Sequence, residues 1–253
     1  MVDKLAKAVM NNEYNLTRLF CDEIIDDNFI RFYDNNIRDM YDHNFSDVYS
    51  ELTPEILTKI KRIREERNED FIHITTFSEI PELDVLGYEK DVVVTMATES
   101  LLIPPLKLSG VSYKNLKDNP ELVNDFIALD LKYDGREYGT NFVGRRMYRY
   151  FTEIIKDKGV NYFGCYINNK LVALCYSYYS NGVVALDGLV VDEDYRHNHI
   201  AINLVKYVQE YYQNCPIYLH AEHEGYPESI YLKIGFRIIY QKYDYFLKKD
   251  HWA

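Results

Sequence analysis

The fold follows most directly from one segment, Asp187-Gly188-Leu189-Val190-Val191-Asp192-Glu193-Asp194-Tyr195-Arg196-His197-Asn198-His199-Ile200-Ala201. An apolar strand ends in this segment, a charged turn follows, and an amphipathic helix begins. The backbone N–H groups at the start of such a helix point toward one anion, and the helix dipole adds roughly half a positive charge there. The segment therefore predicts an anion site whose geometry suits a pyrophosphate.

The second half of this segment closely resembles the acyl-CoA motif of the GCN5-related N-acetyltransferase (GNAT) superfamily, Arg/Gln-x-x-Gly-x-Gly/Ala. Arg196 and Ala201 match the motif, whereas His199 replaces its first glycine, which lets the backbone approach phosphate closely. The resemblance implies that the diphosphate of acetyl-CoA is held by a run of backbone amides, those of Arg196, His197, Asn198, His199, Ile200 and Ala201. Two effects of His199 stay open: it donates its own N–H to the phosphate, or it weakens cofactor binding.

A second match follows about thirty residues later. Tyr231-Leu232-Lys233-Ile234-Gly235-Phe236 reproduces the second half of the family segment Asn-x-x-Ala-x-x-x-Tyr-x-x-x-Gly-Phe. Glu224 and Pro227 stand at its Asn and Ala positions, and the resemblance places Glu224 among the cofactor contacts. The order of elements also agrees with the family: strand 183–191, helix 198–213, strand 217–222, short helix 227–234 and strand 236–247. The resemblance covers about 105–249 and implies a mixed α/β (α+β) fold.

The region before this segment shows the opening elements that the resemblance implies. A strand is expected over 106–117, and Asn119-Pro120-Glu121 predicts the start of a helix that runs to about Leu131. The polar stretch Tyr133–Gly139 is read as a turn, either lining the acceptor pocket or lying on the surface. A second helix then runs to Gly159. Strands 160–167 and 171–179 follow, joined by a hairpin turn at Asn168-Asn169.

The first hundred residues predict a smaller α/β lobe. A helix is expected over 3–20, a strand near 29–33, a helix capped by Thr53-Pro54-Glu55, and strands at 71–77 and 91–97. This order suits a truncated acetyltransferase-like lobe, and an unrelated α/β lobe stays open. Ile103-Pro104-Pro105 is the expected linker, which divides the chain into domains 1–104 and 105–253.

The charge of the chain, −11, is unevenly distributed. Residues 1–100 contain 11 Lys and Arg against 22 Asp and Glu, whereas residues 101–253 contain 18 of each kind. This difference indicates two units. An acidic lobe disfavours nucleic acid as a partner, because binding must neutralise phosphates. It suits a cationic amine, or it is simply a solvated surface.

Other classes of protein are disfavoured by what the sequence lacks. No run approaches the roughly 18 apolar residues of a membrane span, and the polar N-terminus does not resemble a signal peptide. The four cysteines lie far apart, which favours reduced thiols in the cytoplasm over disulfides or a zinc site. His197-x-His199 and His220-x-x-His223 have ligand-like spacing without a neighbouring cluster of Cys or carboxylates, so no metal is expected.

The resemblance also implies a chemistry for the site. The strand residues Leu189, Val190 and Val191 would pair with pantetheine through their backbone, and one of their N–H groups would polarise the thioester carbonyl. Tyr231 matches the tyrosine that protonates the CoA sulfur in many members of the family. The chain contains 25 tyrosines, so Tyr231 is chosen for the acid role only because of its position in this motif.

The general base stays open at this stage. Asp187 is the one charged residue in an apolar strand that is expected to lie mid-sheet, so a buried carboxylate there is either paired or available as a base. Glu222 and His220 share one face of the next strand and are alternatives, acting directly or through water.

Two functions follow. The first is transfer of an acetyl group from acetyl-CoA to the primary amine of a small molecule or peptide by direct attack. The second is a degenerate CoA-binding module that mediates protein association, which His199, Glu224 and Pro227 favour. The acceptor and the formation of a homodimer are left open by the sequence.

Overall fold

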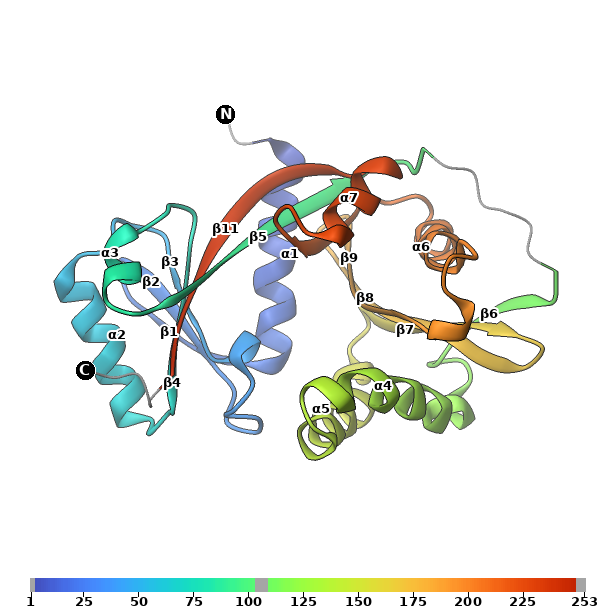
Figure 1. Ribbon diagram of the computed structural model, residues 1–253, viewed down its shortest axis with the longest axis horizontal. Coiled ribbons are helices and arrows are strands. Elements are labelled where there is room, and N and C mark those ends of the chain that lie inside the picture. Colours follow the sequence, from blue (N-terminus) through green and yellow to red (C-terminus); the bar gives the residue numbers. More distant parts are fainter. Residues whose placement is uncertain (1–2, 103–108, 249–253) are drawn as a thin grey trace. The chain divides into compact units, whose positions relative to one another are not determined.

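A computed structural model of the chain describes residues 3–102 and 109–248 (Figure 1). Contacts divide the chain into two compact units. The C-terminal unit consists of Met1–Glu13, Met96–Leu219 and Ser229–Arg237, and the N-terminal unit of Tyr14–Thr95, His220–Glu228 and Ile238–Ala253. The two units are therefore interleaved along the chain. The division into 1–104 and 105–253 stays a prediction, and the expected linker at 103–105 lies outside the described residues.

The C-terminal unit is built on a mixed sheet with the strand order β6-β7-β8-β9-β10. These strands are β6 (Val111–Asn115), β7 (Val160–Ile167), β8 (Lys170–Ser180), β9 (Val183–Val191) and β10 (Ile217–Glu222). Neighbours are antiparallel except β9 and β10, which are parallel. The hairpin between β7 and β8 turns at Asn168 and Asn169, whose φ angles are 50° and 64°. Asparagine tolerates this left-handed conformation, which confirms the predicted turn.

Helices cover both faces of this sheet. They are α4 (Val123–Glu137), α5 (Thr140–Thr152) and α6 (Ile200–Tyr211). The ring of Tyr162 in β7 packs against Phe151 of α5, whereas the next residue, Phe163, packs against Tyr207 of α6. Successive side chains of a strand point to opposite faces. Therefore α5 and α6 lie on opposite sides of the sheet (Figure 1).

Three element boundaries differ from the sequence predictions. The helix α4 begins at Val123 rather than at Asn119, whose side-chain amide donates instead to the Asn115 carbonyl (2.8 Å). It then continues to Glu137, so the expected turn at 133–139 is mostly helix. The helix α5 ends at Thr152, ahead of the expected Gly159. The helix continues through the predicted turn because its last turns contact the segment after β9, and such contacts override local turn propensity.

The N-terminal unit has the strand order β1-β2-β3-β4-β11-β5. Its strands are β1 (Asp22–Ile25), β2 (Phe29–Tyr33), β3 (Ser46–Val48), β4 (Phe71–Thr76), β11 (Arg237–Lys248) and β5 (Glu89–Thr98). Its helices are α2 (Pro54–Glu66) and α3 (Pro81–Val85), while α1 (Lys4–Phe20) and α7 (Tyr226–Lys233) have residues in both units. The Thr53 hydroxyl accepts the Ile56 N–H (3.3 Å), as the predicted cap of α2 requires.

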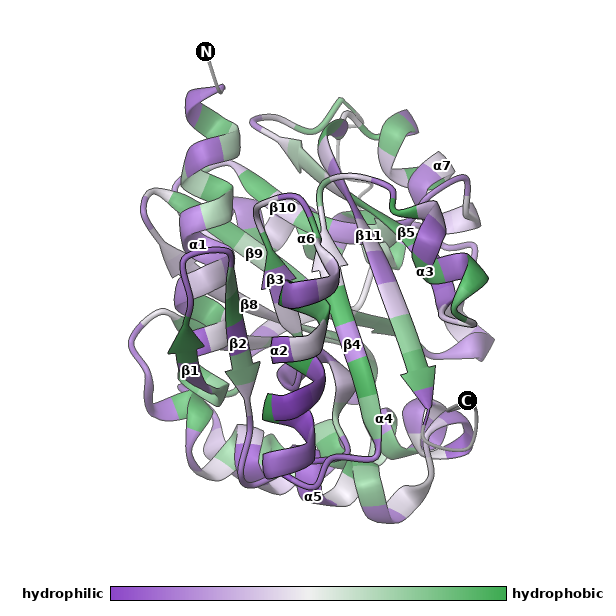
Figure 2. Ribbon diagram, turned by 90° about the vertical axis from the view of Figure 1, so that its left-hand side faces the viewer, coloured by the Kyte–Doolittle hydropathy of each residue, from purple (hydrophilic) through white to green (hydrophobic). Residues whose placement is uncertain are grey.

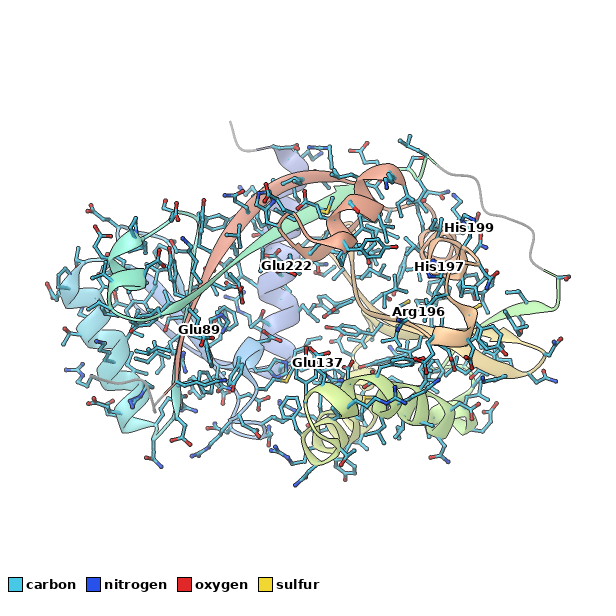
Figure 3. All side chains as sticks on the ribbon, viewed as in Figure 1. Glu89, Glu137, Arg196, His197, His199 and Glu222 are labelled. Atoms are coloured by element: carbon cyan, nitrogen blue, oxygen red, sulfur yellow. The ribbon has the colours of Figure 1, made fainter. Side chains whose placement is uncertain are left out.

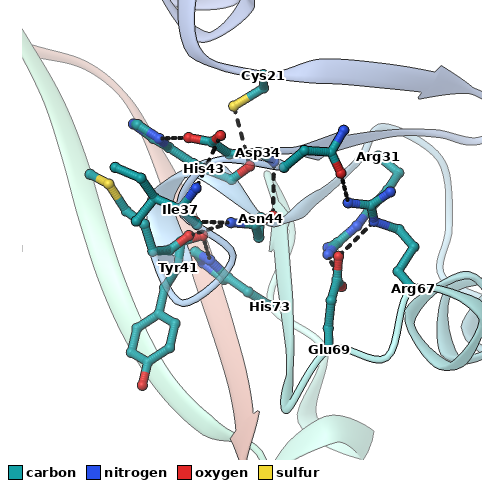
Figure 4. Close-up of polar contacts among 12 residues, drawn as sticks. Cys21, Arg31, Asp34, Ile37, Tyr41, His43, Asn44, Arg67, Glu69 and His73 are labelled. Atoms are coloured by element: carbon teal, nitrogen blue, oxygen red, sulfur yellow. Dashed lines mark hydrogen bonds and ion pairs between the residues drawn. The ribbon is translucent and has the colours of Figure 1, made fainter. Parts of the chain in front are cut away.

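Apolar packing and one buried ion pair hold the N-terminal unit together. Ile56 and Ile60 of α2 are 5% and 1% exposed and pack against the sheet, whereas most of the visible surface of α2 is hydrophilic (Figure 2). The guanidinium of Arg31, 2% exposed, pairs with the carboxylate of Glu69 (Figure 4). Arg67 donates from Nε to the other oxygen of the same carboxylate (2.8 Å). Two cations therefore compensate one buried anion.

One order of elements occurs twice along the chain. First, β3 is followed by α2, the parallel strand β4, α3 and β5. Later, β9 is followed by α6, the parallel strand β10, α7 and β11. This correspondence agrees with an N-terminal lobe that is a truncated acetyltransferase-like domain.

Candidate active site

The segment between β9 and α6 adopts the conformation that the missing glycine would favour. His199 is the residue before α6 and has φ 58°, in the left-handed region, and His197 has φ 63°. Among the described residues, no acceptor pairs with the backbone N–H groups of His199, Ile200 and Ala201. Figure 3 shows Arg196, His197 and His199 together at the start of α6. Amides without an acceptor at a helix start are what anion binding requires, and the diphosphate site at 196–201 stays a prediction.

Asp192 anchors this segment to α4. Its carboxylate, 3% exposed, accepts hydrogen bonds from the Lys132 ammonium (3.0 Å), the Tyr133 phenol (3.3 Å) and the Asp194 N–H (3.2 Å). Burial raises the pKa of Asp192, but the lysine and the amide outweigh it and hold the pKa below its ordinary value. The Glu193 N–H also donates to the oxygen of Tyr133 (2.5 Å). The contacts of Lys132 and Tyr133 with this segment were not predicted, because both residues lie in α4, far away in the sequence.

A bulge in β9 precedes this segment. Leu174 of β8 lies opposite Val190 and Tyr176 lies opposite Asp187, so Gly188 and Leu189 together face the single residue between them on β8. Gly188 has φ 58°, which glycine adopts without strain. Bulges disrupt the ladder of hydrogen bonds and redirect the backbone. The bulge thus lies in the strand that was expected to hold pantetheine.

The ladder between β9 and β10 is short. It contains the pairs Ile217 with Val184 and Tyr218 with Ala185, and β9 continues to Val191 beyond them. The backbone of β9 after Leu186 therefore has no β10 partner among the described residues. An extended ligand chain can pair with such a backbone edge.

The burial expected for Asp187 is wrong. Its side chain is exposed, although its backbone is paired with Tyr176 in the ladder. The Tyr176 phenol donates to one of its carboxylate oxygens (2.6 Å), and the Gly188 N–H donates to the other (2.6 Å). The carboxylate is therefore oriented by two donors and open to a ligand. Tyr176 was missed in the sequence because nothing distinguishes it from the other tyrosines, although its register opposite Asp187 follows from the hairpin.

Tyr231 lies in α7, and its side chain is partly buried beside the ring of Phe236 (5.4 Å between centroids). Burial, followed by the negative charge of Asp187, raises the pKa of Tyr231 to about 12. Its phenol therefore keeps its proton at neutral pH. Asp187 and Tyr231 both belong to the C-terminal unit, and their roles as base and acid stay predictions.

The division between the two units falls inside β10, after Leu219, so Glu222 and Glu224 belong to the N-terminal unit. Glu222 is exposed, as is His220 on the same face of β10, and the His220 ring bonds the Thr95 hydroxyl (3.0 Å). The Glu224 N–H donates to the carboxylate of Glu228 (2.7 Å). A catalytic role for Glu222 and a cofactor contact for Glu224 stay predictions.

Among the described residues, no group of three or more His, Cys, Asp or Glu side chains is placed to hold a metal ion. None of the described helices combines the length and apolar character that a membrane span requires.

Residues 125–236 match the model of the acetyltransferase (GNAT) family. The matched part holds the bulged strand, the segment before α6, and Tyr231. This region of the chain belongs to the GNAT family. No curated protein matches the full sequence.

Solved structures agree with a GNAT fold over nearly the whole chain. A functionally unknown conserved protein from Staphylococcus epidermidis is 16% identical, with a TM-score of 0.77 over 90% of this chain and 94% of that one. A GCN5-related N-acetyltransferase from Kribbella flavida is 10% identical, with a TM-score of 0.63 over 97% and 95%. A tandem GNAT protein from the clavulanic acid biosynthesis pathway is 11% identical, with a TM-score of 0.58 over 94% and 88%. The last resemblance fits the repeated order of elements along the chain.

Proposed function

We propose that the chain transfers an acetyl group from acetyl-CoA to a primary amine of a small molecule or peptide, acting in the cytoplasm. The observation that carries this proposal is the start of α6, where His199 takes a left-handed conformation and leaves backbone N–H groups without acceptors. These amides and Arg196 would hold the diphosphate. Together with the bulged strand, they form two adjacent parts of an acyl-CoA site.

The proposed reaction uses the remaining residues of the site. The backbone of Leu189, Val190 and Val191 would pair with pantetheine and direct an N–H at the thioester carbonyl. The ammonium of the acceptor first gives a proton to Asp187. The amine nitrogen then attacks the carbonyl carbon, a C–N bond forms, and the C–S bond breaks. The CoA sulfur takes the proton of Tyr231, which matches the family tyrosine and is protonated at neutral pH. The nitrogen gives its second proton to the resulting phenolate, which leaves a neutral amide, and Asp187 releases its proton to solvent.

Asp187 is preferred here to Glu222 as the base because of its surroundings. It is exposed, is oriented by Tyr176, and lies close enough to Tyr231 to influence the pKa of that phenol. Glu222 belongs to the other compact unit. We retain it as the second choice.

A CoA-binding module without catalysis is the competing function. His199, Glu224 and Pro227 depart from the family motifs and favour this alternative. It requires the same amides at α6, so the two functions differ in turnover and not in cofactor binding.

One pair of measurements tests both functions. Acetyl-CoA at 100 times its dissociation constant stabilises the folded chain by about 2.7 kcal/mol, which a thermal-shift titration detects. Release of free thiol is then followed across a panel of primary amines. A thermal shift with thiol release supports the enzyme, and a shift without release on any amine supports the binding module. No shift at millimolar acetyl-CoA contradicts both.

The variant Ala201→Glu tests the placement of the diphosphate. A carboxylate among the amides at the start of α6 repels the phosphates, so we expect acetyl-CoA affinity to fall by at least tenfold. Ala201→Gly, which leaves the amides accessible, is the matched control. Unchanged affinity in the glutamate variant would mean that the diphosphate binds elsewhere.

A further inference from the structure

The N-terminal unit contains a cavity of about 800 Å³ that the proposed acetyl transfer does not use. All of its lining residues lie between Val48 and Leu86, inside this unit. The base of the cavity is apolar and includes Val48 and Leu83, each 1% exposed, with Leu57 and Phe77 beside them. A volume of this size is typical of sites for small organic ligands.

The position of the cavity follows from the repeated order of elements. It is lined by the end of β3, the segment 49–53, the first turn of α2, the end of β4 and the helix α3. The strands β3 and β4 are parallel, so both reach the cavity with their carboxyl ends. Ligands of α/β sheets bind at this edge. In the C-terminal unit the corresponding place, between β9 and α6, is the proposed acyl-CoA site.

The start of α2 cannot hold a diphosphate in the way proposed for α6. Pro54 has no N–H, and the N–H groups of Ile56 and Leu57 are bonded to the Thr53 hydroxyl (3.3 Å) and carbonyl (3.0 Å). Few amides are therefore left for a ligand at this end of the helix. Anion binding at a helix start depends on such free amides.

The charge of the cavity lining also disfavours an anionic ligand. Three glutamates, Glu51, Glu79 and Glu82, lie on the cavity wall, and none of the lining residues is Lys, Arg or His. Lys90 compensates Glu79, with its ammonium 2.6 Å from the carboxylate. Within the part of the chain that the structure describes, neither Glu51 nor Glu82 forms an ion pair. Both are exposed, so the negative charge lies at the mouth and the apolar surface lies inside.

We propose that this cavity binds an amphiphilic organic ammonium ion, with its apolar part against Leu57, Phe77 and Leu83 and its charge beside Glu51 and Glu82. The cavity shape supplies the apolar contact, and the uncompensated carboxylates supply the preference for a cation. The proposal makes the N-terminal unit a second ligand-binding unit and does not depend on acetyl transfer.

The test is a calorimetric titration of the full chain, without acetyl-CoA, with hexylammonium, 1-hexanol and hexanoate. These probes share one apolar chain and differ in charge. We expect hexylammonium to bind most tightly, hexanol about tenfold more weakly, and hexanoate not detectably. The double variant Glu51→Gln/Glu82→Gln is expected to lose about tenfold in hexylammonium affinity, or about threefold per carboxylate, and to keep its hexanol affinity.

Two further variants control for folding and for location. Glu55→Gln removes a charge from the first turn of α2, outside the cavity lining, and its binding should match that of the unaltered chain. Ser78→Trp places a large side chain at an exposed position of the cavity wall and should abolish binding of hexylammonium and hexanol alike. Circular dichroism establishes that each variant is folded.

Two results would overturn the proposal. Equal affinity for hexanoate and hexylammonium would remove the charge recognition. Hexylammonium binding that survives Ser78→Trp and is lost in Asp187→Asn would place the ligand in the C-terminal unit. Failure of acetyl-CoA to bind would contradict the proposed acetyl transfer and leave this cavity unaffected.

Discussion

The phenol of Tyr176 donates a 2.6 Å hydrogen bond to the carboxylate of Asp187, across the neighbouring strands β8 and β9. The register of the two strands places these residues opposite each other, immediately before the bulge at Gly188. A carboxylate fixed by a neighbouring hydroxyl keeps one orientation toward a ligand, which a general base requires.

We expect Asp187→Asn to lower turnover by about 10²–10⁴-fold, the usual contribution of a positioned base. Acetyl-CoA affinity should stay unchanged, because the amides at α6 are not altered. Tyr176→Phe should lower turnover by about tenfold, since the base remains and loses one orienting bond. Steady-state kinetics measure turnover and calorimetry measures affinity. Asp194→Asn, an exposed carboxylate after β9, is the control, and normal turnover in Asp187→Asn would transfer the base role to Glu222 or His220.

We expect Tyr231→Phe to lower turnover by about 10²-fold with little change in acetyl-CoA affinity, because the thiolate loses its proton donor. Burial raises the pKa of Tyr231 to about 12, so the phenol is protonated below that value. The pH profile of turnover should therefore show no loss from this group up to about pH 10. Tyr226→Phe, an exposed residue of the same helix, is the control. A profile that falls near pH 10 only in the unaltered chain would contradict the raised pKa.

The left-handed conformation of His199 predicts opposite results for two substitutions. His199→Gly removes the steric cost of φ 58°, about 1 kcal/mol, so acetyl-CoA affinity should be kept or increased. His199→Val keeps the conformation and adds a β-branched side chain, so it should destabilise the folded chain and weaken binding. Chemical unfolding and calorimetry measure the two effects. If the glycine variant binds more weakly, the imidazole itself contributes to phosphate binding.

The buried pair of Arg31 and Glu69 predicts a large effect on stability. Burial, opposed by the charge of Glu69, lowers the pKa of Arg31 to about 10, so the guanidinium is charged at neutral pH. Glu69→Gln leaves this charge without its partner and should lower the free energy of unfolding by about 3–5 kcal/mol. Glu66→Gln removes a partner of Arg62 in an exposed pair and should change it by less than about 1 kcal/mol. Equal unfolding midpoints for the two variants would contradict this assignment.

Local sequence signals predicted most elements of the fold. The strand 183–191, the hairpin at Asn168-Asn169 and the helix capped by Thr53 each depend on neighbouring residues, and all three were found. The continuation of α4 through Tyr133 could not be predicted, because it depends on a contact with Glu193, sixty positions away.

The site was predicted less completely for a similar reason. The position of the anion-binding segment follows from the order strand, turn and helix. The exposure of Asp187 and the bulge that follows it at Gly188 could not be predicted, because neither changes the apolar pattern that predicts the strand.

The interleaving of the two units has a consequence for synthesis on the ribosome. The N-terminal unit pairs β4 with β11, whose residues 243–248 lie opposite 71–76. Translation therefore produces β4 long before β11, and this edge of β4 stays unpaired until residues 237–248 have been synthesised. The N-terminal unit is therefore completed only after the strands of the C-terminal unit have been made, so the nascent chain passes through a long interval in which shielding by a chaperone would reduce aggregation.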